Sequence, residues 1–507
     1  MENNPEVLED DRYDAELLAN VHPAGWKNPE PAPMYNLVVI GAGTAGLVAA
    51  AGAAGLGAKV ALVEKRLLGG DCLNLGCVPS KTIISSARIS GEVRDASGHG
   101  INVLCGSEAD FPAVMERMRR LRAKISVHDS VARFRELGVD VFLGAGRFIS
   151  PDTVEVGGST LRFRKALVAT GARPFVPPLE GLAEAGYLTN ESIFNLTEMP
   201  RRLGILGGGA IGCELAQAFA RLGSEVTIFH NRDRLLDRED PEASRIIKDA
   251  FARDGIRIVF GDWALKSVEA KGSEKILHLE KNGSREAVTV DALLVSVGRS
   301  PNVDGLGLDE AGVKFDRRGG IVVDDTLRTT NPDVYAAGDI CLKYKFTHTA
   351  DASARVVIQN ALFRGRKKVS AFTVPWCTFT DPEVAHVGMY EEEARAKGIQ
   401  AATFTVPFSD VDRAVLEGRE DGFVKLHVAM GTDRIIGATV VAPHAGEMIS
   451  ELALAMSAGV GLKALSGVIH PYPTFSDAIK QAADMYNRTR LTPSVKKLLA
   501  RWLAWAR

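Results

Sequence analysis

The sequence predicts an α/β protein with two doubly wound parallel sheets and a third, C-terminal α+β domain. A long-range repeat carries this expectation: an apolar strand, a Gly-rich turn and an Ala-rich helix occupy residues 37–57 and recur at 203–223. Each copy runs into a second apolar strand, at 58–64 and at 224–230, which completes a βαβ unit. From about residue 373 strands and helices continue without such a turn, which indicates a fold of another kind.

Size and composition limit the classes of function. A chain of 507 residues is too long for one ordinary core, so two or three domains are expected. A net charge of −2 argues against nucleic acid as the main partner. No apolar run reaches the roughly 18 residues of a membrane span. Residues 1–34 are acidic and lack the apolar stretch of a signal peptide, so we expect a cytoplasmic protein.

The first repeat has the features of a dinucleotide site. Its turn reads Gly41-Ala42-Gly43-Thr44-Ala45-Gly46, between an apolar strand and a helix. Glycines at 41, 43 and 46 permit a tight turn and let a pyrophosphate approach the free N–H groups of the helix N-terminus. Glu64 ends the next strand, where a carboxylate can bind a ribose diol. We also expect Gly146 to contact this cofactor.

The second repeat predicts a second dinucleotide site with a different preference. Its turn contains Gly207, Gly209 and Gly212. His230 stands where an acid would favour NADH, and Arg232 follows. Loss of the acid and gain of a cation favour the 2′-phosphate of NADPH, with NADH as the alternative if the arginine is only a solvated loop charge.

Two of the six cysteines are closely spaced, in Cys72-Leu-Asn-Leu-Gly-Cys77. A zinc site is disfavoured because no second pair lies nearby. A short loop closed by a disulfide is strained and reducible, which suits a redox-active pair. We therefore expect catalytic cysteines and no bound metal.

The stretch from Gly69 to Lys81 resembles the active-site motif of the pyridine-nucleotide–disulfide oxidoreductases, which include dihydrolipoyl dehydrogenase, glutathione reductase and mercuric reductase. Four further motifs in the family's order support the resemblance, which runs from about residue 35 to about 490. They are Ala169-Thr170-Gly171, Gly298-Arg299-Ser300-Pro301-Asn302, Tyr335-Ala336-Ala337-Gly338-Asp339, and Thr347-His348.

The resemblance implies FAD and NAD(P)H as cofactors, a homodimer, and roles for individual residues. Cys77 corresponds to the thiol nearest the flavin and Cys72 to the thiol that meets the substrate. Lys81 and Glu214 correspond to an ion pair beside the flavin, where a lysine would stabilise anionic reduced flavin. Further contacts with the cofactors are expected at Thr170, Gly171, Gly298, Asp339 and Thr347.

One stretch departs from the family's disulfide reductases. These carry a His-Pro-Thr motif with an acid five residues after the histidine, and the histidine is the base for the substrate-side thiol. Here Tyr472 stands in the histidine position and Asp477 in the acid position. A phenol, with its pKa near 10, is a poor base at neutral pH. His470 lies two residues away, where a catalytic role and a packing role are both open.

Tyrosine at this position resembles mercuric reductase, since a soft metal ion needs thiolate ligands more than a proton donor. Mercuric reductase also carries a cysteine pair in its C-terminal tail, whereas residues 493–496 here read Pro-Ser-Val-Lys and no cysteine follows Cys377. We expect reduction of a thiol-reactive small-molecule or metal-ion acceptor. The alternatives are a low-molecular-weight disulfide reductase or dihydrolipoyl dehydrogenase, and a membrane-peripheral or complex-bound electron-transfer flavoprotein.

The last expectation concerns residues 488–507, where apolar side chains at helical spacing predict a basic amphipathic helix with tryptophans. This helix is expected either to dock on the protein body or the partner subunit, or to make weak contact with a membrane surface. The expected domain boundaries are an N-terminal arm (1–34), an FAD-binding domain (35–175 and 300–370), an NAD(P)-binding domain (176–299), an interface domain (371–487) and this helix.

Overall fold

The computed structural model describes residues 7, 11–103 and 108–507. These residues form two compact units. Unit 1 comprises residues 1–208, 218–231 and 261–372, and unit 2 comprises residues 209–217, 232–260 and 373–507. The expected domain boundaries divide the chain differently and stay a prediction.

The helices of unit 1 are α1 (Arg12–Val21), α2 (Thr44–Gly55), α3 (Gly70–Asn74), α4 (Cys77–Asp95), α5 (Phe111–Ser126), α6 (Val131–Glu136), α7 (Leu182–Ala185) and α10 (Thr347–Phe363). Its strands are β1 (Tyr35–Ile40), β2 (Val60–Glu64), β3 (Asp140–Leu143), β4 (Arg147–Ser150), β5 (Thr153–Val156), β6 (Ser159–Val168), β7 (Ala172–Pro174), β8 (Arg202–Leu206), β9 (Glu225–Phe229), β11 (Ala264–Lys271), β12 (Glu274–Lys281), β13 (Ser284–Val290), β14 (Ala292–Val295), β15 (Arg299–Pro301), β16 (Phe315–Asp316), β17 (Gly320–Ile321) and β18 (Val334–Ala336).

Unit 2 contains α9 (Pro241–Arg253), α11 (Glu391–Ala396), α12 (Asp412–Leu416), α13 (Ala445–Ala458), α14 (Leu462–Leu465), α15 (Asp477–Thr489) and α16 (Pro493–Trp505). Its strands are β10 (Arg257–Val259), β19 (Pro375–Thr378), β20 (Glu383–Gly388), β21 (Ala401–Pro407), β22 (Phe423–Ala429) and β23 (Ile435–Ala442). Helix α8 (Ala210–Leu222) has residues in both units.

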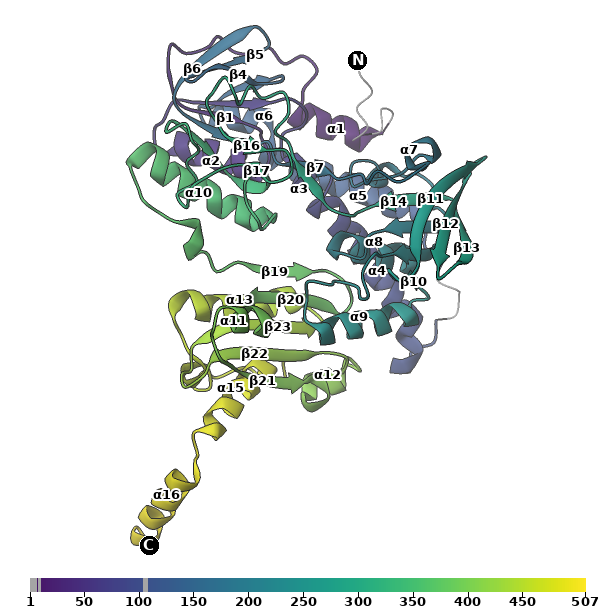
Figure 1. The fold of residues 1–507 in the computed structure, drawn as a ribbon, viewed down its shortest axis with the longest axis vertical. Helices are drawn as coiled ribbons and strands as arrows, with labels where there is room; N and C mark the ends of the chain where they lie inside the picture. Colours follow the sequence, from purple (N-terminus) through teal and green to yellow (C-terminus); the bar gives the residue numbers. More distant parts are fainter. Residues whose placement is uncertain (1–6, 8–10, 104–107) are drawn as a thin grey trace. The chain divides into compact units, whose positions relative to one another are not determined.

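A parallel sheet organises unit 1. Strands β3, β2, β1, β6 and β18 lie side by side in this order, all parallel, and β5 and β4 extend the sheet through an antiparallel pairing with β6. Residues 37–40 of β1 are almost fully buried, as expected for a strand covered on both faces. Helices α2 and α10 pack together (Figure 1), and a Cβ on Gly52 of α2 would lie 2.7 Å from the end of the Ile358 side chain, which would have to move.

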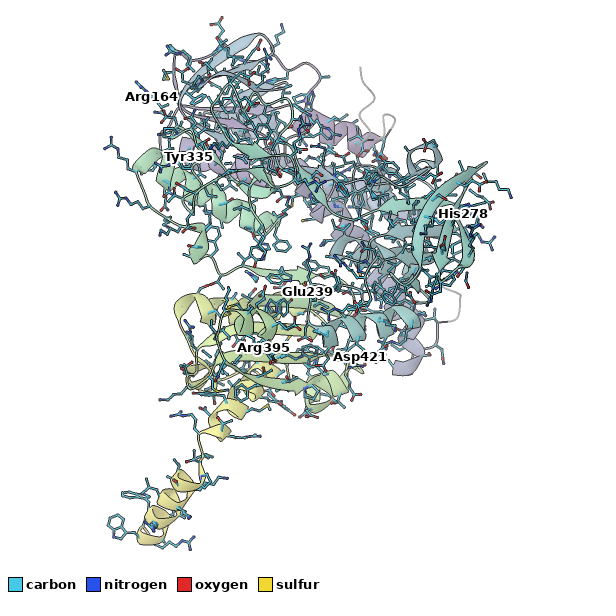
Figure 2. The ribbon with its side chains drawn as sticks, in the orientation of Figure 1. Arg164, Glu239, His278, Tyr335, Arg395 and Asp421 are labelled. Carbon is cyan, nitrogen blue, oxygen red and sulfur yellow. The ribbon has the colours of Figure 1, made fainter. Side chains whose placement is uncertain are left out.

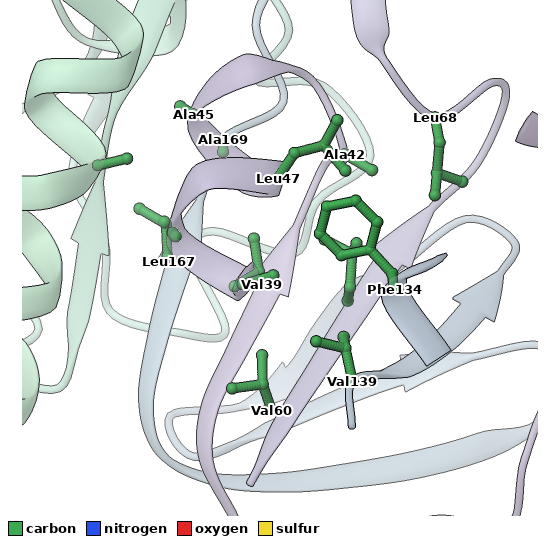
Figure 3. Packing of buried hydrophobic residues seen from close by; sticks show 14 of the residues in the cluster. Val39, Ala42, Ala45, Leu47, Val60, Leu68, Phe134, Val139, Leu167 and Ala169 are labelled. Carbon is green, nitrogen blue, oxygen red and sulfur yellow. The ribbon is translucent and has the colours of Figure 1, made fainter. Parts of the chain in front are cut away.

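The core of this sheet mixes side chains from strands, helices and the segments between them. Val39, Val60 and Leu167 come from three neighbouring strands, and Leu47 of α2 and Phe134 of α6 complete the packing seen in Figure 3. The buried Tyr335 ring of β18, labelled in Figure 2, belongs to the same cluster. This packing holds the carboxyl ends of the parallel strands in one place.

The described part of the N-terminal arm packs onto unit 1. Leu17 and Val21 of α1 are fully buried, and the Asp14 carboxylate accepts a hydrogen bond from Arg122 of α5 at 2.5 Å with both side chains inaccessible to solvent. Arg122 also donates to the backbone carbonyl of Asn74, between the two cysteines of the Cys72–Cys77 loop, at 2.9 Å. Thus α1 supports the loop that carries these cysteines. Residues 1–6 and 8–10 of the expected arm lie outside the described residues.

Besides the two-stranded sheets β15–β7 and β16–β17, the described part of unit 1 contains two larger sheets. Strands β9, β8 and β14 are parallel and form the core of the second βαβ unit, and β11, β12 and β13 form an antiparallel sheet. Both repeats of the sequence therefore fold as the pattern of strand, Gly-rich turn and helix predicts.

Unit 2 is built on the antiparallel sheet β19–β20–β23–β22–β21. Helices α13 and α15 pack on it, and their buried residues share one apolar core with the strands. The half-buried Glu239 carboxylate (Figure 2) joins residues 232–260 to this sheet by accepting hydrogen bonds from Trp376 at 2.8 Å and Tyr390 at 2.5 Å. The poorly solvated position of the carboxyl raises the pKa of Glu239, and the two hydrogen bonds oppose this shift.

Arg122→Met should loosen α1, because it leaves the buried Asp14 carboxylate without its cation. Breaking a buried pair from one side costs about 3–5 kcal/mol. Hydrogen–deuterium exchange should show faster exchange of the α1 amides. The matched control is Arg147→Met, which breaks the exposed Arg147–Glu155 pair and should change little. Asp14→Leu combined with Arg122→Met should restore most of the protection; equal loss in the single and double variants would contradict this assignment.

Candidate functional site

Three motifs that the sequence singles out, at residues 41–46, 169–171 and 335–339, lie where strands β1, β6 and β18 of the parallel sheet of unit 1 end. Ile40 at the end of β1 pairs with Val63 of β2 and with Val168 of β6, and Ala336 at the end of β18 also pairs with Val168. The segments that follow these strands therefore begin at the same level of the sheet. In open α/β sheets ligands bind at this carboxyl edge.

The first Gly-rich turn fits a pyrophosphate. A Cβ on Gly41, at φ +100°, would lie 2.5 Å from the Ala169 carbonyl oxygen, so only glycine permits the turn. A Cβ on Gly43 would meet no atom closer than the Cα of Gly70, at 3.7 Å, so the space above Gly43 is open. Gly43 caps α2 without a side-chain hydrogen bond, so the first N–H groups of the helix remain available to an anion.

Glu64 lies at the end of β2, beside the turn. Its carboxylate accepts hydrogen bonds from the backbone N–H of Ala42 at 2.7 Å and of Arg66 at 2.8 Å. Burial raises the pKa of Glu64, while these hydrogen bonds oppose the shift. These hydrogen bonds fix the carboxylate beside the turn, where the ribose of a dinucleotide would lie next to its pyrophosphate. The N–H groups of the turn and the Glu64 carboxylate therefore fit FAD.

Two motif residues that the sequence does not single out as functional, Asp71 and Arg299, connect this site. Arg299 of β15 forms an ion pair with Asp71 of α3, and its Nε lies 3.6 Å from the carboxylate of Asp339. Burial alone would lower the pKa of Arg299, but Asp71 and Asp339 outweigh it and the pKa is raised. Burial raises the pKa of Asp339, against the effect of Arg299. One guanidinium thus joins α3, which carries Cys72, to the Tyr335–Asp339 motif.

The N-terminus of α10 offers further donors. Phe346 caps this helix without a side-chain hydrogen bond, and the Oγ1 of Thr349 in the first turn is buried with no hydrogen-bond partner among the described residues. Thr170 and Asn302 fix the chain segment after β6 by hydrogen bonds of 3.0 Å and 2.9 Å between them. A polar ligand at this edge would satisfy groups that the protein leaves open.

The structure brings the cysteine pair and Thr347 together. Both cysteines are thiols here, and a hydrogen bond with Cys77 is the largest of the effects that raise the pKa of Cys72, followed by burial. The Sγ of Cys77 lies 3.5 Å from the Oγ1 of Thr347. Cys77 is the first residue of α4, where the helix N-terminus stabilises a thiolate. The neighbouring Cys77 and burial thus oppose a thiolate at Cys72, and the roles of the two thiols in the reaction stay a prediction.

The second Gly-rich turn repeats the geometry of the first. A Cβ on Gly207, at φ +116°, would lie 2.6 Å from the Ser296 carbonyl oxygen, and a Cβ on Gly209 would meet no atom within 4 Å. The Nδ1 of His230 accepts a hydrogen bond from the Gly208 N–H at 3.1 Å, as Glu64 does from Ala42. His230 therefore occupies the position of the ribose-binding acid. Gly212 lies in the first turn of α8, and Gly298, at φ +136°, directly precedes β15.

The positions of Gly146, Lys81 and Glu214 do not test the roles that the sequence predicts for them, so these roles stay predictions. Gly146 lies beside β2, where a Cβ would be 2.8 Å from the Val63 side chain. Lys81 lies one turn after Cys77 on α4. Glu214 of α8 is buried and accepts a hydrogen bond from the Phe379 N–H at 2.9 Å. The pairing of Lys81 with Glu214 stays a prediction because the two residues belong to different units.

In unit 2 the side chains near residue 472 have partners that the sequence does not point to. The Tyr472 hydroxyl is exposed and donates to Asp412 at 2.6 Å, and this hydrogen bond raises the pKa of Tyr472. Asp477, at the start of α15, accepts a hydrogen bond from Gln481 at 2.8 Å. No local pattern could have identified Asp412, because it lies 60 residues before Tyr472.

His470 pairs with a carboxylate of its own. Its Nε2 lies 2.9 Å from the Oε1 of Glu451 on α13, and its Nδ1 lies 3.3 Å from the Val468 carbonyl oxygen. Its side chain is only 5% exposed. Glu451 also lines a pocket of about 340 Å³ with Glu447 and Phe475. A histidine–carboxylate pair is the usual arrangement of a general base, but here both ring nitrogens already face acceptors.

Two properties of the described residues concern metal binding and membrane crossing. Within residues 7, 11–103 and 108–507, His, Cys, Asp and Glu side chains form no group of three or more that could hold a metal ion. Over the same ranges, every helix is too short or too polar to cross a membrane.

Comparison with family models gives two matches. Residues 35–354 match the pyridine nucleotide-disulphide oxidoreductase family, and residues 374–483 match its dimerisation domain. The chain belongs to the pyridine nucleotide-disulphide oxidoreductases. The resemblance predicted from the sequence is confirmed, and with it FAD and NAD(P)H as the family's cofactors and a homodimer through the dimerisation domain.

The relatives divide between two activities. A mercuric reductase of Staphylococcus aureus is 35% identical over 454 residues, which cover 90% of this chain and 83% of the relative. A dihydrolipoyl dehydrogenase of Chlamydia muridarum is 37% identical over 456 residues, covering 89% of this chain and 96% of the relative. Similarity to these proteins therefore does not distinguish a metal ion from a disulfide as the acceptor.

Solved structures agree with the fold. The Cu(II) complex of the HOCl-induced flavoprotein disulfide reductase RclA from Escherichia coli superposes with a TM-score of 0.78 at 29% identity, covering 88% of this chain and 98% of that one. LpdA from Mycobacterium tuberculosis gives a TM-score of 0.80 at 29% identity, covering 89% and 99%. The predicted architecture, two dinucleotide-binding domains and a dimerisation domain, is confirmed.

Serine variants of the two cysteines should separate their roles. After two-electron reduction of the wild-type holoenzyme, a thiolate at Cys77 in contact with the flavin should give a long-wavelength absorbance band. Cys77→Ser should lack this band, and Cys72→Ser should show it before any reductant is added, because Cys77 then has no disulfide partner. The control Cys377→Ser should behave as wild type. Unchanged spectra in both site variants would show that the two thiols are wrongly assigned.

Proposed function

We propose that this protein uses NADPH to reduce a thiophilic metal ion at the Cys72–Cys77 pair. FAD, which the Gly41–Gly46 turn and Glu64 would hold, would supply the path for the two electrons from the nicotinamide to the cysteines. NADPH yields NADP⁺, one proton and two electrons, and the cysteine disulfide takes up the two electrons and two protons to become a dithiol. A metal ion bound by the two thiolates then accepts the electrons, as one Hg(II) or two Cu(II) ions in turn, and the disulfide re-forms with release of two protons.

The observation that carries this proposal is the phenol at position 472. The Tyr472 hydroxyl donates a hydrogen bond to Asp412, which raises the pKa of Tyr472, so the phenol stays protonated at neutral pH and is a poor base for a substrate thiol. Disulfide exchange needs such a base, whereas transfer of electrons to a thiolate-bound soft metal does not. The names of two similar proteins, mercuric reductase and the Cu(II) complex of RclA, are consistent with a metal acceptor.

A second candidate, reduction of a small disulfide or of lipoamide, is favoured by the His470–Glu451 pair at 2.9 Å. If the loop around residue 472 rearranged in the dimer, this imidazole could serve as the base. The similarity to dihydrolipoyl dehydrogenase is compatible with this function. The deciding experiment is an acceptor screen that follows NADPH oxidation with Hg(II), Cu(II), lipoamide, small disulfides and quinones.

Tyr472→His should raise disulfide reductase activity and lower metal-ion reductase activity. Loss of a general base typically costs ~10²–10⁴-fold in rate, so an added imidazole should recover part of that range. A double variant with Asp477→Glu covers the case in which the shorter Asp477 holds the new histidine poorly. The measurement is kcat/KM with lipoamide and with Hg(II).

His470→Gln serves as the matched test of the second candidate. On the leading proposal it leaves metal-ion reduction unchanged. Wild-type reduction of lipoamide at an ordinary enzyme rate, abolished by His470→Gln and unaffected by Tyr472→His, would overturn the metal proposal and transfer the base role to His470.

NADPH should be preferred over NADH. His230 occupies the position of the ribose-binding acid, and Arg232 follows with a side chain that is 66% exposed and 3.9 Å from Asp237. His230→Glu should shift the ratio of the two kcat/KM values toward NADH by about tenfold or more, because a carboxylate repels the 2′-phosphate and binds the free diol. Arg232→Gln should shift it in the same direction.

The control for the cofactor variants is Arg245→Gln, which removes an exposed charge of α9 that pairs with Asp249. It should leave the ratio unchanged. A wild-type enzyme that prefers NADH would refute the assignment and would mean that Arg232 only points to solvent.

A further inference from the structure

The feature that the oxidoreductase function does not use is α16. This helix begins at Pro493 after a Thr492 cap, whose hydroxyl accepts from the Val495 N–H at 3.3 Å, and it follows α15 as a separate helix (Figure 1). Every residue from 488 to 507 is exposed. Isolated helices shorter than about 12–15 residues are marginal in water, and α16 has 13 residues. The helix therefore needs a surface to pack against.

The apolar side chains of α16 gather on one face. Val495, Leu498, Leu499, Trp502 and Leu503 follow helical spacing, and their exposures range from 36% to 67%. Trp505 borders this face at 79% exposure, and its ring lies 5.3 Å from that of Trp502. Two adjacent exposed tryptophans are typical of helices that lie at the boundary between water and lipid.

The positive charge of residues 485–507 favours binding to a negatively charged surface. Residues 485–507 contain six cations and no Asp or Glu, although the whole chain has a net charge of −2. The cations are Arg488, Arg490, Lys496, Lys497, Arg501 and Arg507. A second copy of this nearly neutral chain offers no matching excess of negative charge, whereas an anionic lipid surface does.

We propose that α16 docks the enzyme on an anionic membrane surface, with its apolar face in the headgroup region and its lysines and arginines against the lipid phosphates. At about 1.5 Å per residue the helix is about 20 Å long, shorter than the hydrocarbon core of about 30 Å, so it lies in the plane of the interface and does not cross the bilayer. This inference is independent of the electron acceptor.

The test uses the full-length holoenzyme and sedimentation with lipid vesicles. The protein should bind vesicles of equal parts phosphatidylcholine and phosphatidylglycerol, should bind vesicles of phosphatidylcholine alone much more weakly, and should dissociate as salt is raised. Removal of residues 491–507 should abolish binding and leave the rate of NADPH oxidation with soluble acceptors unchanged.

Matched variants separate the two parts of the interaction. Lys496→Gln with Lys497→Gln should weaken binding on the order of tenfold, and the same change at the exposed pair Lys367 and Lys368 should have no effect. Trp502→Ala with Trp505→Ala should also weaken binding, and in the wild type vesicles should shift the tryptophan emission to shorter wavelength.

Two results would overturn the proposal. One is that the full chain and the truncated chain bind the vesicles equally, or that neither chain binds them. The other is tryptophan emission that is already shifted without lipid and moves to longer wavelength when the dimer dissociates, which would show that α16 covers a second copy of the chain.

Discussion

The parallel register of β1, β2, β6 and β18 is the constraint on which the site in unit 1 depends. Because Val168 pairs both with Ile40 and with Ala336, the segments after three strands start at one level of the sheet. Residues separated by about three hundred positions in the sequence thereby share one edge. The buried strand side chains of Figure 3 hold this register, since a shift of one residue would turn each of them to the opposite face.

Two arginine side chains hold the cysteine loop in place beside the sheet. Arg299 lies between Asp71 and Asp339, so the helix that carries Cys72 is tied to the segment after β18. Arg122 donates a hydrogen bond to the Asn74 carbonyl, and its charge is balanced by Asp14 of α1. The cysteine loop is thus held by two guanidinium groups, one paired with Asp71 and one bound to the Asn74 carbonyl.

Local chemistry made much of this site predictable. Gly41 and Gly207 are needed wherever a chain turns with positive φ against a neighbouring carbonyl, and both turns have the expected form. Glu64 ends β2 and His230 directly follows β9, and each accepts a hydrogen bond from the Gly-rich turn of its own repeat. Asp412 and Glu451, by contrast, follow no motif and become partners of Tyr472 and His470 only through the packing of unit 2.

The sequence by itself determined the family, the form of the two Gly-rich turns and the amphipathic character of α16, because each depends on residue types at fixed short spacings. Only the tertiary structure decided which charges meet: Arg299 with two carboxylates, Asp14 with Arg122, and Tyr472 with Asp412. Such partners come from segments far apart in the chain, and electrostatic attraction has no sequence periodicity. They form where the packing of strands and helices brings opposite charges to hydrogen-bonding distance in a site that water reaches poorly.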